Sequence, residues 1–140
     1  MKDLKQFIKT TIREFLNENQ NSDNYLYHGT SIENAENIIN NGFNEDTYWG
    51  DKSTAEGYAY SYNVPILIKI SKSEIINLIE PNSTLLNFYE DNIDEDEDYK
   101  DIIDSWYNST QTAKDSLDIF GSVILPPNNL NIDVSNIIKI

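Results

Sequence analysis

The amino-acid sequence predicts one α+β domain with a split, mostly antiparallel β-sheet and flanking helices, preceded by an amphipathic helix. Three observations lead to this fold class. The chain has 140 residues, of which 39% are hydrophobic, and this suits one compact domain. Strand and helix patterns alternate early in the chain, and strand patterns recur near its end. Apolar residues at three- and four-residue steps before residue 17 indicate the leading helix.

The leading helix is predicted over residues 4–16, and we assign residues 1–20 to it as a separate unit. Its apolar side chains form one stripe, with lysines on the flanks. The polar stretch 17–24 has nothing to bury and is typical of a linker to a domain over residues 24–140. Three interpretations stay open: the helix packs on its own domain, docks on a partner protein or lies on a membrane surface, which its weakly basic polar face disfavours. Lysines interrupt the apolar centre that a secretory signal needs.

The domain opens with a predicted strand over residues 25–29, which is aromatic and ends at a glycine. A helix follows directly. Thr30 is its expected N-cap, and Glu33 stands three residues further on to complete a capping box. Gly42 lies where a helix end favours a left-handed residue, so this helix is expected to stop there.

The rest of the domain is predicted from shorter patterns. Residues 47–49 indicate a strand, and Ser53 with Glu56 forms a second capping box for a helix that runs to about residue 62. The later elements, in order, are a strand over 64–70, an apolar run over 75–79 ended by Pro81, helices over 101–107 and 112–120, and strands over 122–125 and 137–140.

The composition excludes several classes of function. The formal net charge is −14, so we do not expect nucleic acid as a partner, since that affinity comes from lysine and arginine. Cysteine is absent, which removes disulfides, thiolate nucleophiles and cysteine zinc sites. The apolar runs are too short to span a membrane, so a soluble protein is expected. The wealth of asparagine, isoleucine and lysine is typical of an AT-rich bacterial or phage genome, and we expect the bacterial host cytoplasm or a phage particle.

The acidic stretch over residues 90–104 resembles the start of a calcium loop at Asp94, Asp96 and Asp98. That loop needs glycine at its sixth position and glutamate at its twelfth. Tyr99 and Ser105 stand at these two positions instead. We therefore expect a solvated loop that leads into a helix, and no metal site.

His28 is the one histidine of the chain. A lone histidine is ordinarily a core or surface residue. Its predicted place at a strand end, followed by Gly29, also suits a ligand, because glycine lets a planar carboxamide approach the backbone N–H and C=O. The next helix N-terminus would favour a pyrophosphate nearby.

Residues 27–30, followed at a fitting distance by Gly42-Phe43, resemble the first motif of the ADP-ribosyltransferase superfamily. The match is to the histidine–tyrosine–glutamate branch, which includes poly-ADP-ribose polymerases and diphtheria-type toxins. The resemblance implies that NAD is the substrate. His28 would then hydrogen-bond the nicotinamide-side ribose, Gly29 would pair with the nicotinamide amide, and Thr30 would lie near the adenosine half.

Residues 48–58 resemble the second motif of that family, an aromatic pair followed by serine, alanine and tyrosine at the start of a helix. With the later strands, the resemblance covers most of the chain after the linker. It implies that Tyr48 and Tyr58 bracket the nicotinamide ring and that Ser53 donates a hydrogen bond to its amide. For the two tyrosines and for Trp49, plain core packing is the alternative interpretation.

The sequence departs from the family at the catalytic acid. In this branch a glutamate on the late strand bonds the ribose 2′-hydroxyl and stabilises the transition state as nicotinamide leaves. Ser122, or Gly121, stands where that glutamate is expected. Losing such a group costs on the order of a hundred- to a thousandfold in rate. Asp118 or Asp115, just upstream, would supply the carboxylate if the register of the match is different.

Three functions remain open from the sequence. The first is an NAD-dependent mono-ADP-ribosyltransferase that acts on a protein or other macromolecular acceptor. The second is a catalytically inactive relative that binds a nucleotide or a protein. The third is a structural accessory protein that docks through the leading helix. Related arginine-dependent activities are not expected, because the chain has a single arginine, Arg13, and it lies outside the predicted domain.

Overall fold

The computed structural model describes residues 24–140. The predicted helix over residues 1–20 lies outside the described residues. The strands are β1 (Tyr25–Ser31), β2 (Thr47–Gly50), β3 (Pro65–Ser71), β4 (Glu80–Pro81), β5 (Ser122–Leu125) and β6 (Ile137–Lys139). The helices are α2 (Ile32–Asn41), α3 (Lys52–Ala59), α4 (Lys72–Ile75), α5 (Ser83–Asp91), α6 (Glu97–Tyr107), α7 (Ala113–Phe120) and the one-turn 3-10 helix η2 (Val134–Asn136).

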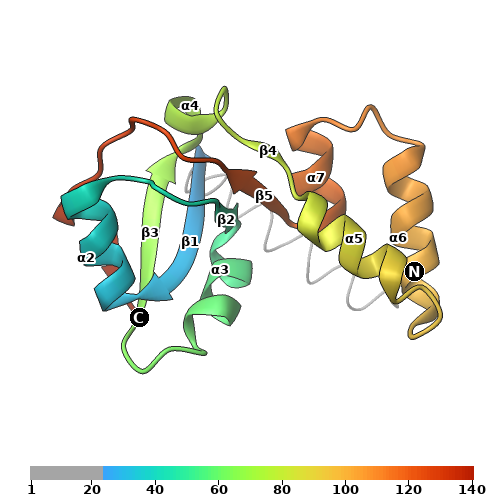
Figure 1. The fold of residues 1–140 in the computed structure, drawn as a ribbon, viewed down its shortest axis with the longest axis horizontal. Coiled ribbons are helices and arrows are strands. Elements are labelled where there is room, and N and C mark those ends of the chain that lie inside the picture. Colours follow the sequence, from blue (N-terminus) through green and yellow to red (C-terminus); the bar gives the residue numbers. More distant parts are fainter. Residues whose placement is uncertain (1–23) are drawn as a thin grey trace.

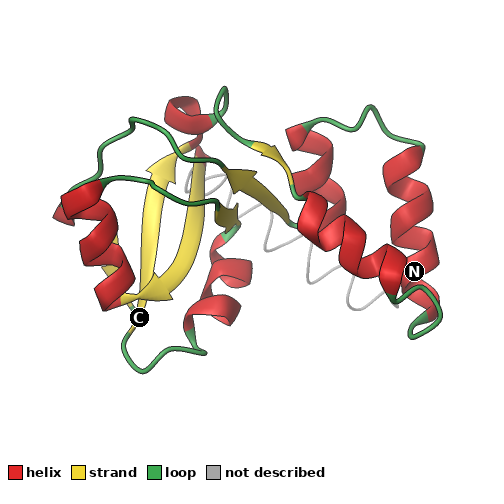
Figure 2. Cartoon of the chain, in the orientation of Figure 1, coloured by secondary structure: helices red, strands yellow, loops and turns green. Residues whose placement is uncertain are grey.

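The six strands form one antiparallel sheet in the order β4-β5-β2-β1-β3-β6. Helices α2 and α3 flank the β1–β3 part of the sheet, and α5, α6 and α7 gather at the other end, beyond β4 and β5 (Figures 1 and 2). The predicted α+β class with an antiparallel sheet is confirmed. No helix within residues 24–140 is long and apolar enough to cross a membrane.

The sheet separates two hydrophobic clusters, because side chains along a strand point alternately to its two faces. On the α2 face, Leu26 of β1 and Trp49 of β2 belong to the main cluster. On the α3 face, Tyr27 of β1 belongs to a smaller cluster with Ala55 and Ala59 of α3. Even-numbered side chains of β1 therefore face α2, and odd-numbered ones face α3.

β1 is paired unequally on its two sides. It makes seven residue pairs with β3 along its whole length. With β2 it pairs only at Tyr27↔Gly50. Beyond this pair the β1–β2 ladder is interrupted, and we call the unpaired stretch on the β2 side of residues 28–31 the gap.

Two helix starts differ from the prediction. The pairing with β3 keeps β1 extended through Ser31, so Ser31 rather than Thr30 caps α2, and Thr30 is buried in the sheet. The side chain of Asp51 caps α3, where Ser53 was predicted, and α3 ends at Ala59, short of residue 62. Aspartate is as good an N-cap as serine and stands directly after β2, so the helix begins earlier.

The helical group at the far end of the sheet is only partly predicted. Helix α5 was not predicted at all, although the Asn82 side chain caps it. Helix α6 begins at Glu97, earlier than the predicted residue 101. Aromatic side chains join the three helices: Trp106 of α6 and Tyr89 of α5 both lie against Phe120 of α7, with ring centroids 5.2 Å and 5.9 Å apart.

Candidate functional site

His28 lies in the middle of β1 rather than at its end. Its Nδ1 is 2.7 Å from the main-chain carbonyl of Tyr48, and its ring lies 5.3 Å from that of Trp49. A carbonyl only accepts hydrogen bonds, so Nδ1 carries the proton. Burial lowers the pKa of His28, and the bond to Tyr48 opposes this more weakly. The imidazole is therefore neutral at pH 7, and its Nε2 is a hydrogen-bond acceptor.

Nε2 is the free end of this imidazole. It has no hydrogen-bond partner among the described residues, and it is not among their buried unpaired atoms. It is therefore open to the space beside the ring.

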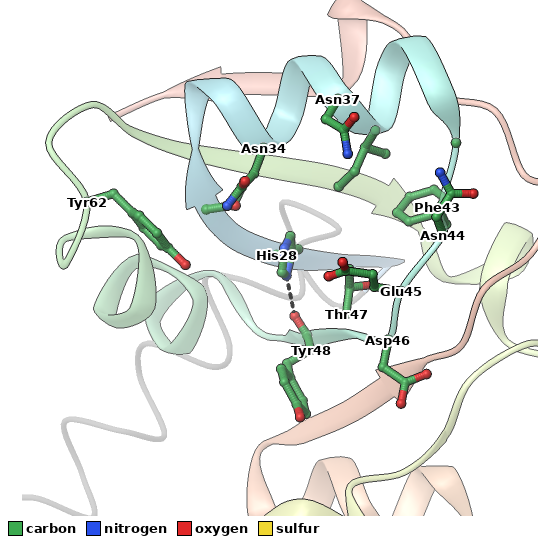
Figure 3. Close-up of a pocket in the computed structure, with 13 residues that line it drawn as sticks. His28, Asn34, Asn37, Phe43, Asn44, Glu45, Asp46, Thr47, Tyr48 and Tyr62 are labelled. Atoms are coloured by element: carbon green, nitrogen blue, oxygen red, sulfur yellow. Dashed lines mark hydrogen bonds between the residues drawn. The ribbon is translucent and has the colours of Figure 1, made fainter.

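The space beside His28 is a cavity of about 310 Å³ between β1, α2, β2 and the loop that joins α2 to β2 (Figure 3). Its walls hold three asparagines, two carboxylates, two threonines and two tyrosines, and no lysine or arginine of the described residues. The complete lining is His28, Thr30, Asn34, Asn37, Ile38, Gly42, Phe43, Asn44, Glu45, Asp46, Thr47, Tyr48 and Tyr62. We call this space the His28 cavity.

Gly29 lies in the gap between β1 and β2. Residues of an antiparallel pair alternate between hydrogen-bonded and non-bonded positions. The N–H of Ile32 donates to the carbonyl of Val64 at 3.2 Å, and this pair continues the register of β1 against β3. Hydrogen-bonded positions alternate, so the even-numbered residues of β1 are the ones bonded to β3. The N–H and C=O of Gly29 consequently point toward β2, where a regular ladder would place Tyr48 opposite.

The other side of Gly29 is closed by helix α3. A Cβ at this position would lie 1.9 Å from the carbonyl oxygen of Ala55 and 2.8 Å from the nitrogen of Ala59. The glycine is thus required for close packing of α3 on β1. On this side the Gly29 backbone is closed to a ligand.

The predicted aromatic residues separate into two groups. Trp49 is 1% exposed and belongs to the core, so core packing is the correct interpretation for it. Tyr48 and Tyr58 are 38% and 49% exposed, so core packing is wrong for them. Neighbouring side chains of a strand point to opposite faces, and Trp49 faces α2, so the ring of Tyr48 lies on the α3 face. Its hydroxyl donates to the hydroxyl of Thr84 in α5 at 3.3 Å.

The predicted binding residues consequently lie on two faces of the sheet. His28 and Thr30 face α2 and line the His28 cavity. The ring of Tyr48 lies on the α3 face, and Tyr58 and Ser53 are exposed residues of α3 itself. Gly29 lies next to His28 in β1 but does not line the His28 cavity.

Ser122 occupies the start of β5, opposite Gly50. It is 1% exposed and does not line the His28 cavity. Its hydroxyl accepts a hydrogen bond from Asn82 at 2.9 Å, and its carbonyl accepts one from Ser116 at 2.7 Å. Ser122 therefore joins α5 through its hydroxyl and α7 through its main-chain carbonyl, and its side chain is closed to a ligand.

The two upstream aspartates lie away from His28. Asp118 is exposed, forms an ion pair with Lys114 at 3.0 Å and borders a separate cavity of about 170 Å³. Asp115 completes the capping box of α7 at Thr112, and hydrogen bonds from Thr110 and Thr112 lower its pKa. Neither carboxylate lines the His28 cavity.

Sequence reasoning missed the carboxylates and amides of the cavity wall. Glu45 and Asp46 come directly after the Gly42-Phe43 part of the first motif, and that proximity was the available signal. Within residues 24–140, no three histidines, aspartates or glutamates lie close enough together to hold a metal ion.

No protein-family model, curated protein or solved structure matches this chain. Its function is therefore inferred from the geometry of its own residues.

Proposed function

We propose that residues 24–140 bind NAD, ADP-ribose or a closely related nucleotide at the His28 cavity, and that they cleave the nicotinamide–ribose bond slowly or not at all. The observation that carries the proposal is the neutral imidazole of His28. Its Nδ1 is fixed by the Tyr48 carbonyl, and its Nε2 is left as an acceptor beside the cavity. A sugar hydroxyl is the matching donor.

The gap in the sheet suits the nicotinamide end of such a ligand. A carboxamide offers one donor group and one acceptor, which complement the C=O and N–H that Gly29 directs into the gap. Tyr48 and Tyr58 are exposed on the α3 face and offer rings for stacking beside it. This arrangement supports the roles that the family resemblance implies for these three residues.

The size of the His28 cavity suits half of a dinucleotide. Ligand pockets span roughly 300–1,000 Å³, and this one is at the lower limit. With the carboxamide in the gap, the proposal places the adenosine-side ribose in the cavity. In this proposal His28 and Thr30 both serve the adenosine half, and the nicotinamide-side ribose that the family resemblance implies at His28 is the alternative.

The slow cleavage of the nicotinamide–ribose bond is explained by the residue at the start of β5. The position expected for the catalytic glutamate holds Ser122, whose hydroxyl is buried and bonded to Asn82. Two aspartates were considered from the sequence as replacements. Asp118 forms an ion pair with Lys114, and Asp115 takes part in the N-terminal cap of α7. Without a carboxylate at the nicotinamide-side ribose, the oxocarbenium-like transition state loses its main electrostatic stabilisation.

The second candidate is the NAD-dependent mono-ADP-ribosyltransferase. Glu45 and Asp46 favour it, because they are carboxylates that line the same cavity as His28. They lie on the α2 side of the sheet, opposite the tyrosines proposed for nicotinamide. A transferase would therefore require the nicotinamide-side ribose, rather than the adenosine-side ribose, to occupy the cavity.

One pair of measurements tests the proposal and separates the two candidates. Calorimetric titration with NAD and ADP-ribose should show binding to the wild type and at least about tenfold weaker binding to His28→Asn, which keeps a donor for Tyr48 and removes Nε2. Nicotinamide release from NAD should stay at the background rate. Release that depends on Glu45 would favour the transferase, and binding that His28→Asn leaves unchanged would refute the proposed site.

A further inference from the structure

We infer that Glu45 makes the His28 cavity selective for a ribose with free hydroxyls and against a ribose that carries a 2′-phosphate, so that NAD binds in preference to NADP. The inference rests on the proposed function, because it concerns which nucleotide that site accepts. It goes beyond it by assigning a specificity-determining residue that the sequence motifs do not include.

The charged side chains of the cavity wall are both carboxylates. The Nε2 of His28 accepts, and the carboxylates of Glu45 and Asp46 accept. In Figure 3 the Glu45 side chain points toward His28, whereas the Asp46 carboxylate points away from it. Hydroxyl groups donate to such a wall, and a phosphate has only acceptor oxygens at neutral pH.

No cation offsets this wall. None of the 13 lining residues is lysine or arginine. Two N–H groups at the N-terminus of α2, a natural place for a phosphate, are already engaged: that of Ile32 bonds the Val64 carbonyl, and that of Asn34 bonds the Ser31 hydroxyl at 3.1 Å. Fewer donors therefore remain there for the pyrophosphate that the sequence led us to expect at this helix end.

Glu45 is available for this role. It is exposed, and it makes no hydrogen bond or ion pair with the residues that the structure describes. Carboxylates that bond a ribose 2′-hydroxyl select NAD in other nucleotide folds, and a cationic residue is what accommodates the 2′-phosphate. Repulsion between a carboxylate and a phosphate at contact distance is large enough to change affinity about tenfold in an exposed site.

The test is a calorimetric titration of the full chain with NAD and with NADP, in three proteins. The wild type should bind NAD at least about tenfold more tightly than NADP. In Glu45→Gln this ratio should fall to within about threefold of unity, because the repulsion is removed while an amide remains to bond the hydroxyls. Glu36→Gln is the matched control, since Glu36 is exposed on α2, undergoes the same substitution and does not line the cavity. It should keep the wild-type ratio.

The possible outcomes distinguish a failure of the selectivity from a failure of nucleotide binding itself. Equal affinity of the wild type for NAD and NADP, or a preference that Glu45→Gln leaves unchanged, overturns the selectivity while binding itself stands. Absence of binding for both nucleotides overturns the proposed function and the selectivity with it. The wild-type preference should also weaken at high ionic strength, because salt screens an exposed charge pair, and a preference that is independent of salt would contradict the electrostatic cause.

Discussion

The imidazole of His28 donates from Nδ1 to the main-chain carbonyl of Tyr48, at 2.7 Å, where strands β1 and β2 part. In a regular ladder that carbonyl would face the N–H of Gly29. The His28 side chain bonds this carbonyl in place of the Gly29 N–H. The N–H and C=O of Gly29 are therefore left in the gap, and the imidazole is held in one tautomer. The same contact therefore determines both the gap and the acceptor in the cavity.

The first prediction concerns pH. Burial lowers the pKa of His28 in the folded chain, so the unfolded chain binds this proton at higher pH than the folded chain does. The free energy of unfolding should therefore be fully retained above the unfolded pKa, about 6.5, and fall as the pH drops below it. Urea unfolding on both sides of that value measures the effect. Because His28 is the one histidine, His28→Asn should remove this part of the pH dependence, and an identical fall in both proteins would contradict the assignment.

The second prediction separates the two nitrogens of His28 by stability. His28→Ala leaves the Tyr48 carbonyl without its partner and removes a ring that lies against Trp49, so we expect a loss of about 1–3 kcal/mol. His28→Asn keeps a donor near the position of Nδ1 and should cost less. Chemical denaturation of the two variants checks the order. A larger loss in the asparagine variant would show that the Tyr48 bond does not stabilise the fold.

The third prediction concerns the approach of α3 to β1. Gly29→Ala would place a methyl group 1.9 Å from the Ala55 carbonyl, so the helix must shift, at a cost of about 1–3 kcal/mol or more. Gly57→Ala is the matched control, because a Cβ there meets nothing within 4 Å and the residue lies inside α3. It should be neutral or stabilise the protein by up to about 1 kcal/mol. Equal melting temperatures for the two variants would show that the close approach is not a constraint.

The fourth prediction concerns the buried bonds behind β5. The Ser116 hydroxyl accepts from the Asn82 N–H at 2.9 Å and donates to the Ser122 carbonyl, so Ser116→Ala leaves two buried groups unpaired. We expect a loss of about 1–3 kcal/mol per unpaired group. Ser53→Ala, at an exposed position, should change stability by less than about 0.5 kcal/mol. Equal losses in the two variants would mean that this network does not hold the helical group to the sheet.

The order and type of most elements could be predicted from the sequence, because they depend on local periodicity and on caps. The strand over residues 122–125 is an example, since its four apolar or small residues are all buried in β5. The helix caps were less predictable, because pairing with β3 decides where β1 ends and so moves the α2 cap from Thr30 to Ser31. Helix α5 was missed, because none of its residues is fully buried and it is held by contacts with α6 and by the Tyr89–Phe120 ring contact with α7, which the local pattern does not show.

The candidate site was predictable only in part. His28 and Thr30 were found from the motifs and do line one cavity, which Tyr48 also borders on the side where its main-chain carbonyl bonds His28. The sequence could not show that the ring of Tyr48 lies on the other face of the sheet, because this depends on how β2 is paired. It could not show this for Tyr58 either, because that depends on which face α3 covers. It also could not show that Ser122 is closed to a ligand, since Asn82, its partner, lies 40 residues away along the chain.

The most direct test of the central claim is an NMR titration of the single imidazole. The ring protons of His28 give one set of histidine signals, and addition of ADP-ribose should shift them in a saturable way, with the affinity that calorimetry measures. NAD should do the same. If the nucleotide binds while the His28 signals stay unmoved, or if neither nucleotide changes them at millimolar concentration, the nucleotide site proposed at His28 is wrong.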